Sequence, residues 1–185
     1  MNMRIDYADG YYVGEVDYND NESGWGTFYY TNGDKLEGVW RDGEICNRAT
    51  YYFANGDRYE GELRNGEFNG DGTLYFKNGD RIEAWWLNGE VYSTGTYYFA
   101  DGDRYKGEFR DGKFNGKGIF YASDGGRYEG EFRDGVKHGM GTLYSPRGDK
   151  MICNWRNDEP HGIATYYFAN GDVLEREFFN GKPID

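Results

Sequence analysis

Short runs in which aromatic and polar residues alternate recur along the chain, and glycine-containing turns separate them. The run at Tyr105 has the order Tyr-Lys-Gly-Glu-Phe-Arg, and the run at Tyr128, 23 residues later, has the order Tyr-Glu-Gly-Glu-Phe-Arg. Alternation with a period of two predicts β-strands, whereas no stretch of about ten residues or more has the helical period. A motif that returns at a fixed spacing predicts a repeat array.

Each repeat can be counted from the first residue of its aromatic run. The starts are Tyr12, Leu36, Tyr59, Ile82, Tyr105, Tyr128 and Met151, followed by a partial repeat at Leu174. All steps are 23 residues except the first, which is 24. We therefore expect residues 1–185 to form a single repeat array, because these steps leave no span for another domain.

Two strands are predicted in each repeat, and Asn55-Gly56 illustrates the turn that joins one repeat to the next. Asn-Gly between aromatic runs is a strong signal for a two-residue hairpin, because both central residues can adopt positive φ. Such a turn would place Tyr52 opposite Tyr59, on the same face as Gly61. Within a repeat, a longer loop with a glycine bend is expected to join the two strands.

Stacked hairpins of this kind predict an all-β, single-layer antiparallel meander. Strands about 4.8 Å apart would give an elongated array on the order of 70 Å long. The right-handed twist of strands would coil the array into an open curved ribbon. One face of the ribbon would carry a groove lined by aromatic side chains.

Composition supports a folded but thin structure. The chain has 19 Tyr, 12 Phe and 5 Trp, and it has 30 Gly with only 3 Pro. The aromatic side chains supply enough buriable area to argue against disorder. A thick globular core would favour Leu, Ile and Val over Tyr.

Charge and cysteine content narrow the classes of partner and compartment. The net charge of −12 opposes nucleic acid and anionic lipid. Cys46 and Cys153 are far apart, so they predict no disulfide framework and favour a reducing compartment. The first residues lack the apolar segment of a signal peptide. These features predict a soluble, cytoplasmic protein.

The recurring pattern Tyr-Glu-Gly-Glu-Phe-x-Asp/Asn-Gly-x-x-x-Gly-x-Gly-Thr-x-Tyr resembles the MORN (membrane occupation and recognition nexus) repeat, from about Tyr12 to Gly181. The resemblance implies a sheet of hairpins with an aromatic groove. Members of the family act as scaffolds, dimerise or bind partner proteins, and some were proposed to bind phosphoinositides. In some relatives the array is an accessory to a kinase or methyltransferase domain, for which this chain has no counterpart.

Several repeats depart from this pattern at a glycine position. Cys46, Ala84, Ser93, Cys153 and Arg176 mark the repeats concerned. Where a glycine is lost, the packing of rings is expected to differ, so these repeats are either simply irregular or candidates for contacts with a partner.

The predicted partner-binding groove combines two rows of aromatic residues, one from each strand of the repeats. Its residues are Trp40, Tyr52, Tyr75, Trp86, Tyr98, Phe109, Tyr121, Phe132, Tyr144, Trp155 and Tyr167. A single layer cannot cover both of its faces, so part of these rows would remain open to a peptide or helix. The alternative is that the rows are simply the core. If they bind a partner, Trp86→Ala and Trp155→Ala should impair binding more than soluble yield.

Other repeated polar residues favour structural roles. The aspartates after the turns, such as Asp57 and Asp103, are too far apart to share a calcium ion and are expected to cap turns. His138 and His161 occupy equivalent loop positions one repeat apart, which is too far for one zinc ion. No nucleophile and base occur as a motif, so the sequence predicts no catalytic residues, no cofactor and no metal.

Basic residues recur beside the first strand of each repeat, and these alone would suggest phosphate binding. They share a strand face with glutamates, as Arg58 does with Glu60, so the stripe is expected to be ion-paired. The sequence therefore favours a non-enzymatic scaffold that binds a protein segment. The alternatives are a peripheral membrane adaptor that binds phosphoinositides and an accessory subunit of an enzyme on another chain. Self-association through the terminal repeats is also expected, because the last repeat lacks its second strand and leaves an open sheet edge.

Overall fold

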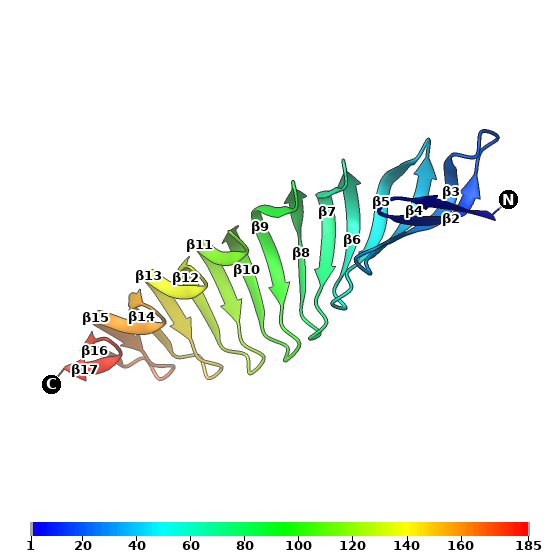
Figure 1. Cartoon of the computed structure of the whole chain (residues 1–185). Helices are drawn as coiled ribbons and strands as arrows, with labels where there is room; N and C mark the ends of the chain where they lie inside the picture. The colour runs from blue at the N-terminus through cyan, green and yellow to red at the C-terminus, as the bar shows by residue number, and fades with distance from the viewer. Residues whose placement is uncertain (1, 185) are drawn as a thin grey trace. The chain divides into compact units, whose positions relative to one another are not determined.

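The computed structural model describes residues 2–184, and these residues form β-strands and turns with no helix. The chain divides into two compact units, Met1–Glu90 and Val91–Asp185. Within each unit, strands that follow one another in sequence lie side by side (Figure 1).

The first unit contains eight strands in chain order. They are β1 (Asn2–Tyr7), β2 (Gly10–Val16), β3 (Glu22–Tyr30), β4 (Lys35–Arg41), β5 (Glu44–Tyr52), β6 (Arg58–Arg64), β7 (Glu67–Tyr75) and β8 (Arg81–Leu87). Each pairs antiparallel with the next.

The second unit continues the same pattern. Its strands are β9 (Glu90–Tyr98), β10 (Arg104–Arg110), β11 (Lys113–Tyr121), β12 (Arg127–Arg133), β13 (Val136–Tyr144), β14 (Lys150–Arg156), β15 (Glu159–Tyr167), β16 (Val173–Phe179) and β17 (Lys182–Ile184). Consecutive strands are again antiparallel neighbours. The predicted all-β antiparallel meander of hairpin repeats is therefore confirmed.

The positions of the two kinds of turn are the reverse of those predicted. The two-residue turn lies within each repeat, and the longer turn lies between repeats. The tight two-residue turn is within the repeat, at Asn65-Gly66, where both residues have positive φ and Arg64 pairs with Glu67. The turn between repeats has three residues, Ala54–Gly56, and only Gly56 has positive φ, at 98°. Phe53 N–H donates to Asp57 O, and Gly56 N–H donates to Phe53 O.

This extra turn residue shifts the strand register by one. Tyr52 lies opposite Arg58, and Tyr51 lies opposite Tyr59. The prediction that Tyr52 faces Tyr59 was wrong, because a one-residue shift moves every side chain of a strand to the other face of the sheet. The three-residue hairpin is a type I turn followed by a left-handed glycine, and the sequence Asn-Gly suits both turn types.

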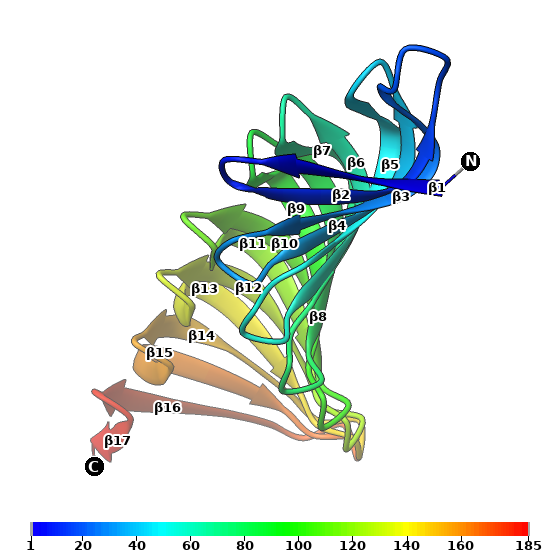
Figure 2. The same cartoon turned by 45° about the vertical axis from the view of Figure 1, so that its right-hand side comes forward.

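A β-bulge bends the hairpins of six repeats toward one face. In the repeat at Tyr59 the register shifts after Gly61, and Gly70 on the partner strand has φ of 62°. The segment predicted as a long loop is in fact the first part of β7, which the bulge redirects. Figure 2 shows the hairpin tips curling over in each unit.

The core lies under these curled tips. The Tyr59 ring covers the bare backbone of Gly61 and Gly72, and its hydroxyl donates to Glu62 O at 3.1 Å. Phe68 from the curled tip stacks on Tyr59 with the ring centroids 3.7 Å apart. Four tyrosines at this repeat position, Tyr12, Tyr59, Tyr105 and Tyr128, are almost completely buried. A single-layered sheet thereby acquires a core without a second layer.

Two strands near the chain termini were not anticipated. β1 pairs with β2 before the first counted repeat. The partial repeat at Leu174 has a short second strand, β17, which pairs with Glu177–Phe179 of β16. The prediction that this repeat lacks a second strand was therefore wrong.

Candidate functional site

The residues of the predicted groove lie on two opposite faces of the sheet. We call the face of Tyr59, Gly61 and Trp86 the core face, and the face of Arg58 and Tyr75 the outer face. On the core face are Trp40, Trp86, Phe109, Phe132 and Trp155; on the outer face are Tyr52, Tyr75, Tyr98, Tyr121, Tyr144 and Tyr167. They cannot line one groove, because the three-residue turns put the second-strand tyrosines opposite the basic residues.

The core-face members of that set are buried. Trp86 and Trp155 are each 4% exposed. The indole N–H of Trp86 donates to Gly72 O at 3.0 Å, and Trp40 makes the equivalent bond to Gly26 O at 3.1 Å. Tyr59 meets Trp86 edge to face with the centroids 5.6 Å apart. These rings pack against the preceding repeat and do not form an open surface.

The outer-face tyrosines pack under basic side chains from neighbouring strands. The cation lies 3.8 Å from the ring centroid for Arg127 and Tyr144, and 4.6 Å for Lys150 and Tyr167. The same contact joins Lys35 to Tyr52, Arg58 to Tyr75, and Arg104 to Tyr121. Cation–π contacts of this kind stabilise by about 0.5–1 kcal/mol each at exposed sites.

Glutamates engage several of the same cations. Arg127 Nε lies 2.6 Å from a Glu129 carboxylate oxygen, and Lys35 Nζ lies 2.7 Å from Glu37. The expected ion-paired stripe is therefore present for these residues.

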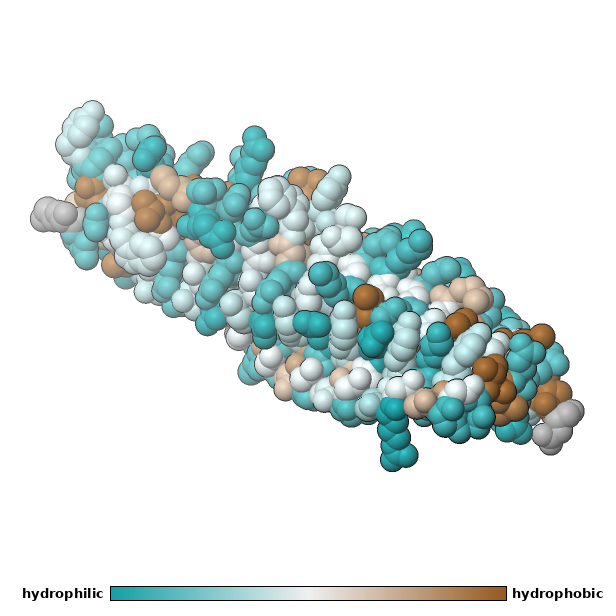
Figure 3. Space-filling model, turned by 180° about the vertical axis from the view of Figure 1, so that it is seen from behind, coloured by the Kyte–Doolittle hydropathy of each residue, from teal (hydrophilic) through white to brown (hydrophobic). Residues whose placement is uncertain are grey.

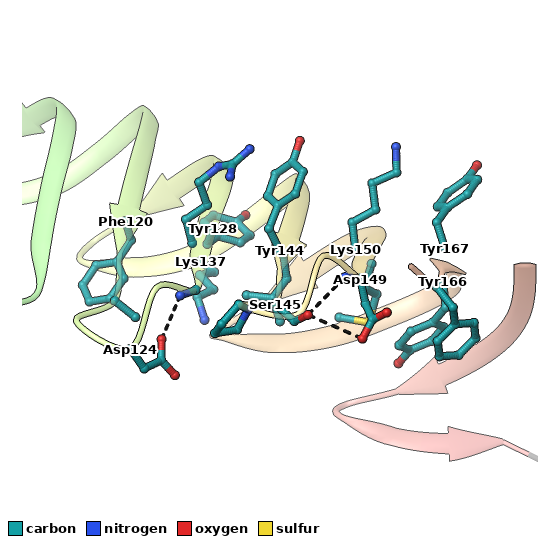
Figure 4. A pocket seen from close by; sticks show the side chains of 17 residues that line it. Phe120, Asp124, Tyr128, Lys137, Tyr144, Ser145, Asp149, Lys150, Tyr166 and Tyr167 are labelled. Atoms are coloured by element: carbon teal, nitrogen blue, oxygen red, sulfur yellow. Dashed lines mark hydrogen bonds between the residues drawn. The ribbon is translucent and has the colours of Figure 1, made fainter. Parts of the chain in front are cut away.

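A hollow of about 610 Å³ opens on the core face of the second unit (Figure 4). Its lining residues are Phe120, Ala122, Asp124, Gly126, Arg127, Tyr128, Lys137, Leu143, Tyr144, Ser145, Pro146, Asp149, Lys150, Met151, Tyr166, Tyr167 and Phe168. In Figure 4, Tyr144, Lys150 and Tyr167 point to one side of the strands, whereas Phe120, Asp124 and Tyr166 point to the other. The core-face lining is mainly aromatic and aliphatic.

The hollow exists because two turns lack a ring that other repeats have. The residue that opens the turn is Tyr30, Phe53, Phe76, Phe99 or Phe168 elsewhere, but Ala122 and Ser145 in two successive repeats. In the preceding repeat, Phe99 packs against Phe120 with the centroids 5.8 Å apart. The next two turns leave that space unfilled.

A third ring is replaced in the curled tip above the hollow. Phe68 and Phe114 stack on the buried tyrosine of their repeats, at 3.7 and 3.8 Å between centroids. The equivalent residue in the repeat at Tyr128 is Lys137, whose ammonium lies 5.4 Å from the Tyr128 ring and 5.1 Å from the Trp155 ring. Burial raises the pKa of Tyr128 well above its ordinary value, so its hydroxyl stays protonated.

The turn-to-turn hydrogen bonds are also interrupted at the hollow. The aspartate that ends one turn accepts a backbone N–H twenty residues later: Asp57 from Lys77, Asp103 from Ser123 and Asp149 from Ala169. Between the two turns of the hollow, the acceptor position is Gly126 and the donor position is Pro146, which has no N–H. The loss of donor and acceptor together leaves no polar group unsatisfied there.

Charged groups lie at both ends of the hollow. Lys137 lies toward the hairpin tip, and Asp124 and Asp149 lie in the turns at the opposite end of the strands. Asp124 Oδ1 accepts from Gly126 N–H at 2.8 Å, and Asp149 Oδ1 accepts from Ala169 N–H at 2.8 Å. The second carboxylate oxygen of Asp149 accepts from the Ser145 hydroxyl at 3.5 Å, and that of Asp124 lies outside the bond to Gly126.

Sequence reasoning missed the residues that create this hollow. It examined lost glycines in the strands, whereas the decisive changes are lost rings at Ala122, Ser145 and Lys137. A comparison of the turn positions across the repeats would have revealed them, because aromatic residues occupy those positions in most copies.

The turn aspartates cap turns, as predicted. In the turn at Asn55, Asp57 N–H donates to Asn55 Oδ1 at 2.9 Å, and the Asn55 amide donates to Asp57 Oδ2 at 2.8 Å. Within residues 2–184, no three His, Cys, Asp or Glu side chains gather as a metal site. No helix in this part of the chain could span a membrane.

Apolar side chains are exposed over the last strands of the second unit (Figure 3). Val173 and Phe179 are each 59% exposed, and Leu174 and Ile184 are also exposed. Leu174 occupies the position at which other repeats bury a tyrosine. This patch is a second candidate for an interaction surface.

The profile of the MORN repeat matches residues 37–58, 59–81, 94–104, 105–127, 128–150 and 154–173, which together make up more than half of the chain. No curated protein sequence matches the chain.

Two solved structures have a similar fold. One is the TCP domain of SAS-4 from Drosophila melanogaster in complex with a proline-rich motif of Ana2, with 15% identity, a TM-score of 0.56, and coverage of 96% of this chain and 90% of that one. The other is the TCP10c domain of Drosophila melanogaster Sas-4, with 15% identity, a TM-score of 0.50, and coverage of 95% and 98%. At this identity the likeness concerns the fold.

Proposed function

Since the chain belongs to the MORN repeat family, we propose that it is a non-enzymatic scaffold that holds a segment of a partner protein in the core-face hollow of the second unit. The observation that carries this proposal is the mainly apolar hollow of about 610 Å³. Binding pockets are commonly apolar clefts of roughly 300–1,000 Å³ with a few polar groups at their margins. Here Lys137, Asp124 and Asp149 are such groups.

The similar structure of the SAS-4 TCP domain supports a peptide as the kind of ligand. That protein is in complex with a proline-rich motif of its partner Ana2. A meander of strands can therefore present a surface to a peptide without a second layer. For this chain, we propose a protein segment of that general kind, bound in the hollow.

The chemistry of the lining supports binding rather than catalysis. The hollow has no histidine or cysteine among its lining residues, and the Ser145 hydroxyl accepts from the backbone N–H groups of Arg147 and Asp149. The same hydroxyl donates to Asp149 Oδ2 at 3.5 Å, so it is engaged within its own turn, and no imidazole among the lining residues can deprotonate it. The proposal accordingly assigns no reaction to the hollow.

Differential capture tests the proposal. The protein and an Ala122→Phe/Ser145→Phe variant, in which two rings block the hollow, are used to capture proteins from the source cells. A partner held in the hollow is recovered with the protein but not with the blocked variant. Its binding segment, purified and titrated, should lose affinity for the blocked variant at least tenfold.

Ser123→Phe is the matched control, because Ser123 lies in the same turn but outside the lining. It should behave like the unchanged protein. If the blocked variant binds the purified segment as tightly as the control does, the hollow is not the binding site.

Binding to phosphoinositide vesicles would support the peripheral membrane alternative. The outer-face cations are held by tyrosine rings and glutamates, as in Arg127 with Tyr144 and Glu129. We therefore expect no salt-sensitive flotation with anionic vesicles. Flotation that falls as salt rises would favour the membrane adaptor instead.

Self-association is a second candidate, favoured by the exposed patch of Val173, Leu174, Phe179 and Ile184. An apolar edge strand is a ready surface for pairing with another copy. Light scattering over a range of concentrations tests it. A dimer that Leu174→Lys dissociates would support this role, whereas a monomer at all concentrations would remove it.

A further inference from the structure

The chemistry of the partner segment follows from the rings that the hollow lacks, and this inference rests on the proposed function. We propose that the segment inserts an aromatic side chain into the space beside Ala122 and Ser145 and places a basic side chain against Asp124 and Asp149. The partner would thus complete a core that this chain leaves unfinished.

The neighbouring repeats act as an internal template for the aromatic group. Phe99 packs against Phe114 edge to face with the centroids 6.1 Å apart, and against Phe120 at 5.8 Å. Phe53 makes the equivalent edge-to-face contact with Phe68, at 6.0 Å. The same backbone position therefore accommodates a phenyl ring wherever the sequence provides one.

The walls of the hollow still offer the partners that such a ring would contact. Phe120 precedes Ala122 on one side, and Tyr166 and Phe168 come from the far side. Tyr166 and Phe168 stack at 6.3 Å between centroids, so both present ring surfaces. Aromatic pairs stabilise beyond the area that they bury, which favours a ring over an aliphatic group here.

Charge complementarity decides what should flank the ring. Asp124 and Asp149 mark the turn end of the hollow, and the chain as a whole has a net charge of −12. Arg127 and Lys150 also line it, but their cations lie over the outer-face rings of Tyr144 and Tyr167, on the other side of the strands. A basic residue beside the aromatic one would pair with these carboxylates and would be steered toward them.

Lys137, at the other end, does not alter this requirement. Its ammonium faces the Tyr128 and Trp155 rings. The inserted aromatic side chain can add a further ring to this cation, whereas a second cation at this end would be repelled. The segment is therefore expected to have a defined direction, with its basic residue toward the turns.

The test uses random peptides displayed on phage. They are selected on the immobilised protein and counter-selected on the Ala122→Phe/Ser145→Phe variant. Selected peptides should share an aromatic residue within a few positions of Arg or Lys. They should bind the Ser123→Phe control as they bind the unchanged protein.

The outcomes separate the two proposals. If no peptide prefers the protein to the blocked variant, the hollow is not a peptide site and the proposed function fails. If peptides are selected through the hollow but lack an enriched aromatic residue, the proposed function stands and this inference is wrong. Enrichment of aromatic residues without basic ones removes the charge half of the inference.

A second variant tests that charge half directly. Asp124→Asn/Asp149→Asn removes the charges but keeps the side-chain oxygens that accept from Gly126 and Ala169. Exposed charge pairs are weak, so affinity for a selected peptide should fall by roughly 2- to 30-fold and lose most of its salt dependence. Unchanged affinity and salt dependence would overturn the assignment of the basic residue.

Discussion

At the scale of single residues, a tyrosine and two glycines act as one unit. A Cβ atom on Gly118 would lie 2.5 Å from the Tyr105 ring, and one on Gly107 would lie 2.4 Å from its hydroxyl. The ring therefore needs both glycines. Where a strand glycine is replaced, the tyrosine is replaced too, as in Ile82 with Ala84 and in Met151 with Cys153.

Gly118→Ala tests this unit. The added methyl group overpacks the site and should lower the free energy of unfolding by about 1–3 kcal/mol. Adding Tyr105→Ile reproduces the aliphatic arrangement of Ile82 and should recover part of that loss. Urea unfolding of both single variants and the double variant gives the coupling energy, expected at roughly 1 kcal/mol or more. Additive effects would refute the coupling.

Two adjacent tryptophans differ in burial and provide a matched pair. Trp86 is 4% exposed, whereas Trp85 on the outer face is 51% exposed. Trp86→Ala should destabilise the protein by about 3–5 kcal/mol, because it opens a cavity. Trp85→Ala should change stability by no more than about 0.5 kcal/mol. If urea unfolding shows that the two substitutions lower stability equally, the difference in burial between Trp86 and Trp85 is contradicted.

That expectation replaces the one drawn from the sequence, in which Trp86 was a binding residue whose loss would impair partner binding more than soluble yield. The buried position and the indole hydrogen bond to Gly72 O indicate a structural role. Soluble yield and thermal unfolding of Trp86→Ala compared with Trp85→Ala distinguish the two roles.

At the scale of elements, the turns between repeats determine which residues share a face. The three-residue turn at Ala54–Gly56 pairs Tyr52 with Arg58 and so assembles the outer row of tyrosines and cations. The aspartates of these turns then join each turn to the next. Among the turns whose hydrogen bonds are described above, only the turns at Gly126 and Pro146 lack this aspartate-to-backbone hydrogen bond.

The missing hydrogen bond between the turns at Gly126 and Pro146 can be restored by substitution. Pro146→Ala supplies an N–H with no carboxylate to bind, and Gly126→Asp supplies the carboxylate. The double variant should be more stable than Pro146→Ala alone by about 0.5–1.5 kcal/mol, the typical net value of a hydrogen bond. Gly126→Asp without the second change should gain nothing. If Gly126→Asp alone raises the thermal unfolding temperature, the missing N–H at position 146 is not what prevents the stabilisation.

At the scale of the whole molecule, repeated burial of phenols couples folding to pH. Desolvation raises the pKa of Tyr12 and Tyr59 from 10.0 to about 12. It also raises the pKa of the Cys153 thiol from 9.0 to about 11. In each case the folded state holds its proton more tightly than the unfolded state does.

The contribution of these groups to stability is therefore fully present below pH 9. It falls as the pH rises, from 9 to 11 through Cys153 and from 10 to 12 through the tyrosines. Urea midpoints measured across this range should decrease steadily. Cys153→Ala should flatten the first part of the curve. A midpoint that does not change between pH 9 and 12 would contradict the burial of these groups.

The period of the sequence was enough to predict the class of fold. Each repeat supplies its own strands, turns and tyrosine–glycine unit, so local chemistry repeated at a fixed spacing specifies an antiparallel meander. The face of each second-strand residue was not predictable with the same certainty, because Asn-Gly suits turns of two and of three residues. One residue more in the turn moved Tyr52, Tyr144 and their equivalents to the outer face.

By itself, then, the sequence determined the repeats, the strands and the tyrosine–glycine units, because these depend on neighbours within one repeat. Only the tertiary structure decided which surfaces are open. Trp86 and Trp155 are covered by curled tips, and a hollow remains where Ala122, Ser145 and Lys137 replace rings in adjoining repeats. Whether a surface is open depends on side chains brought together from different repeats, and no single repeat contains that information.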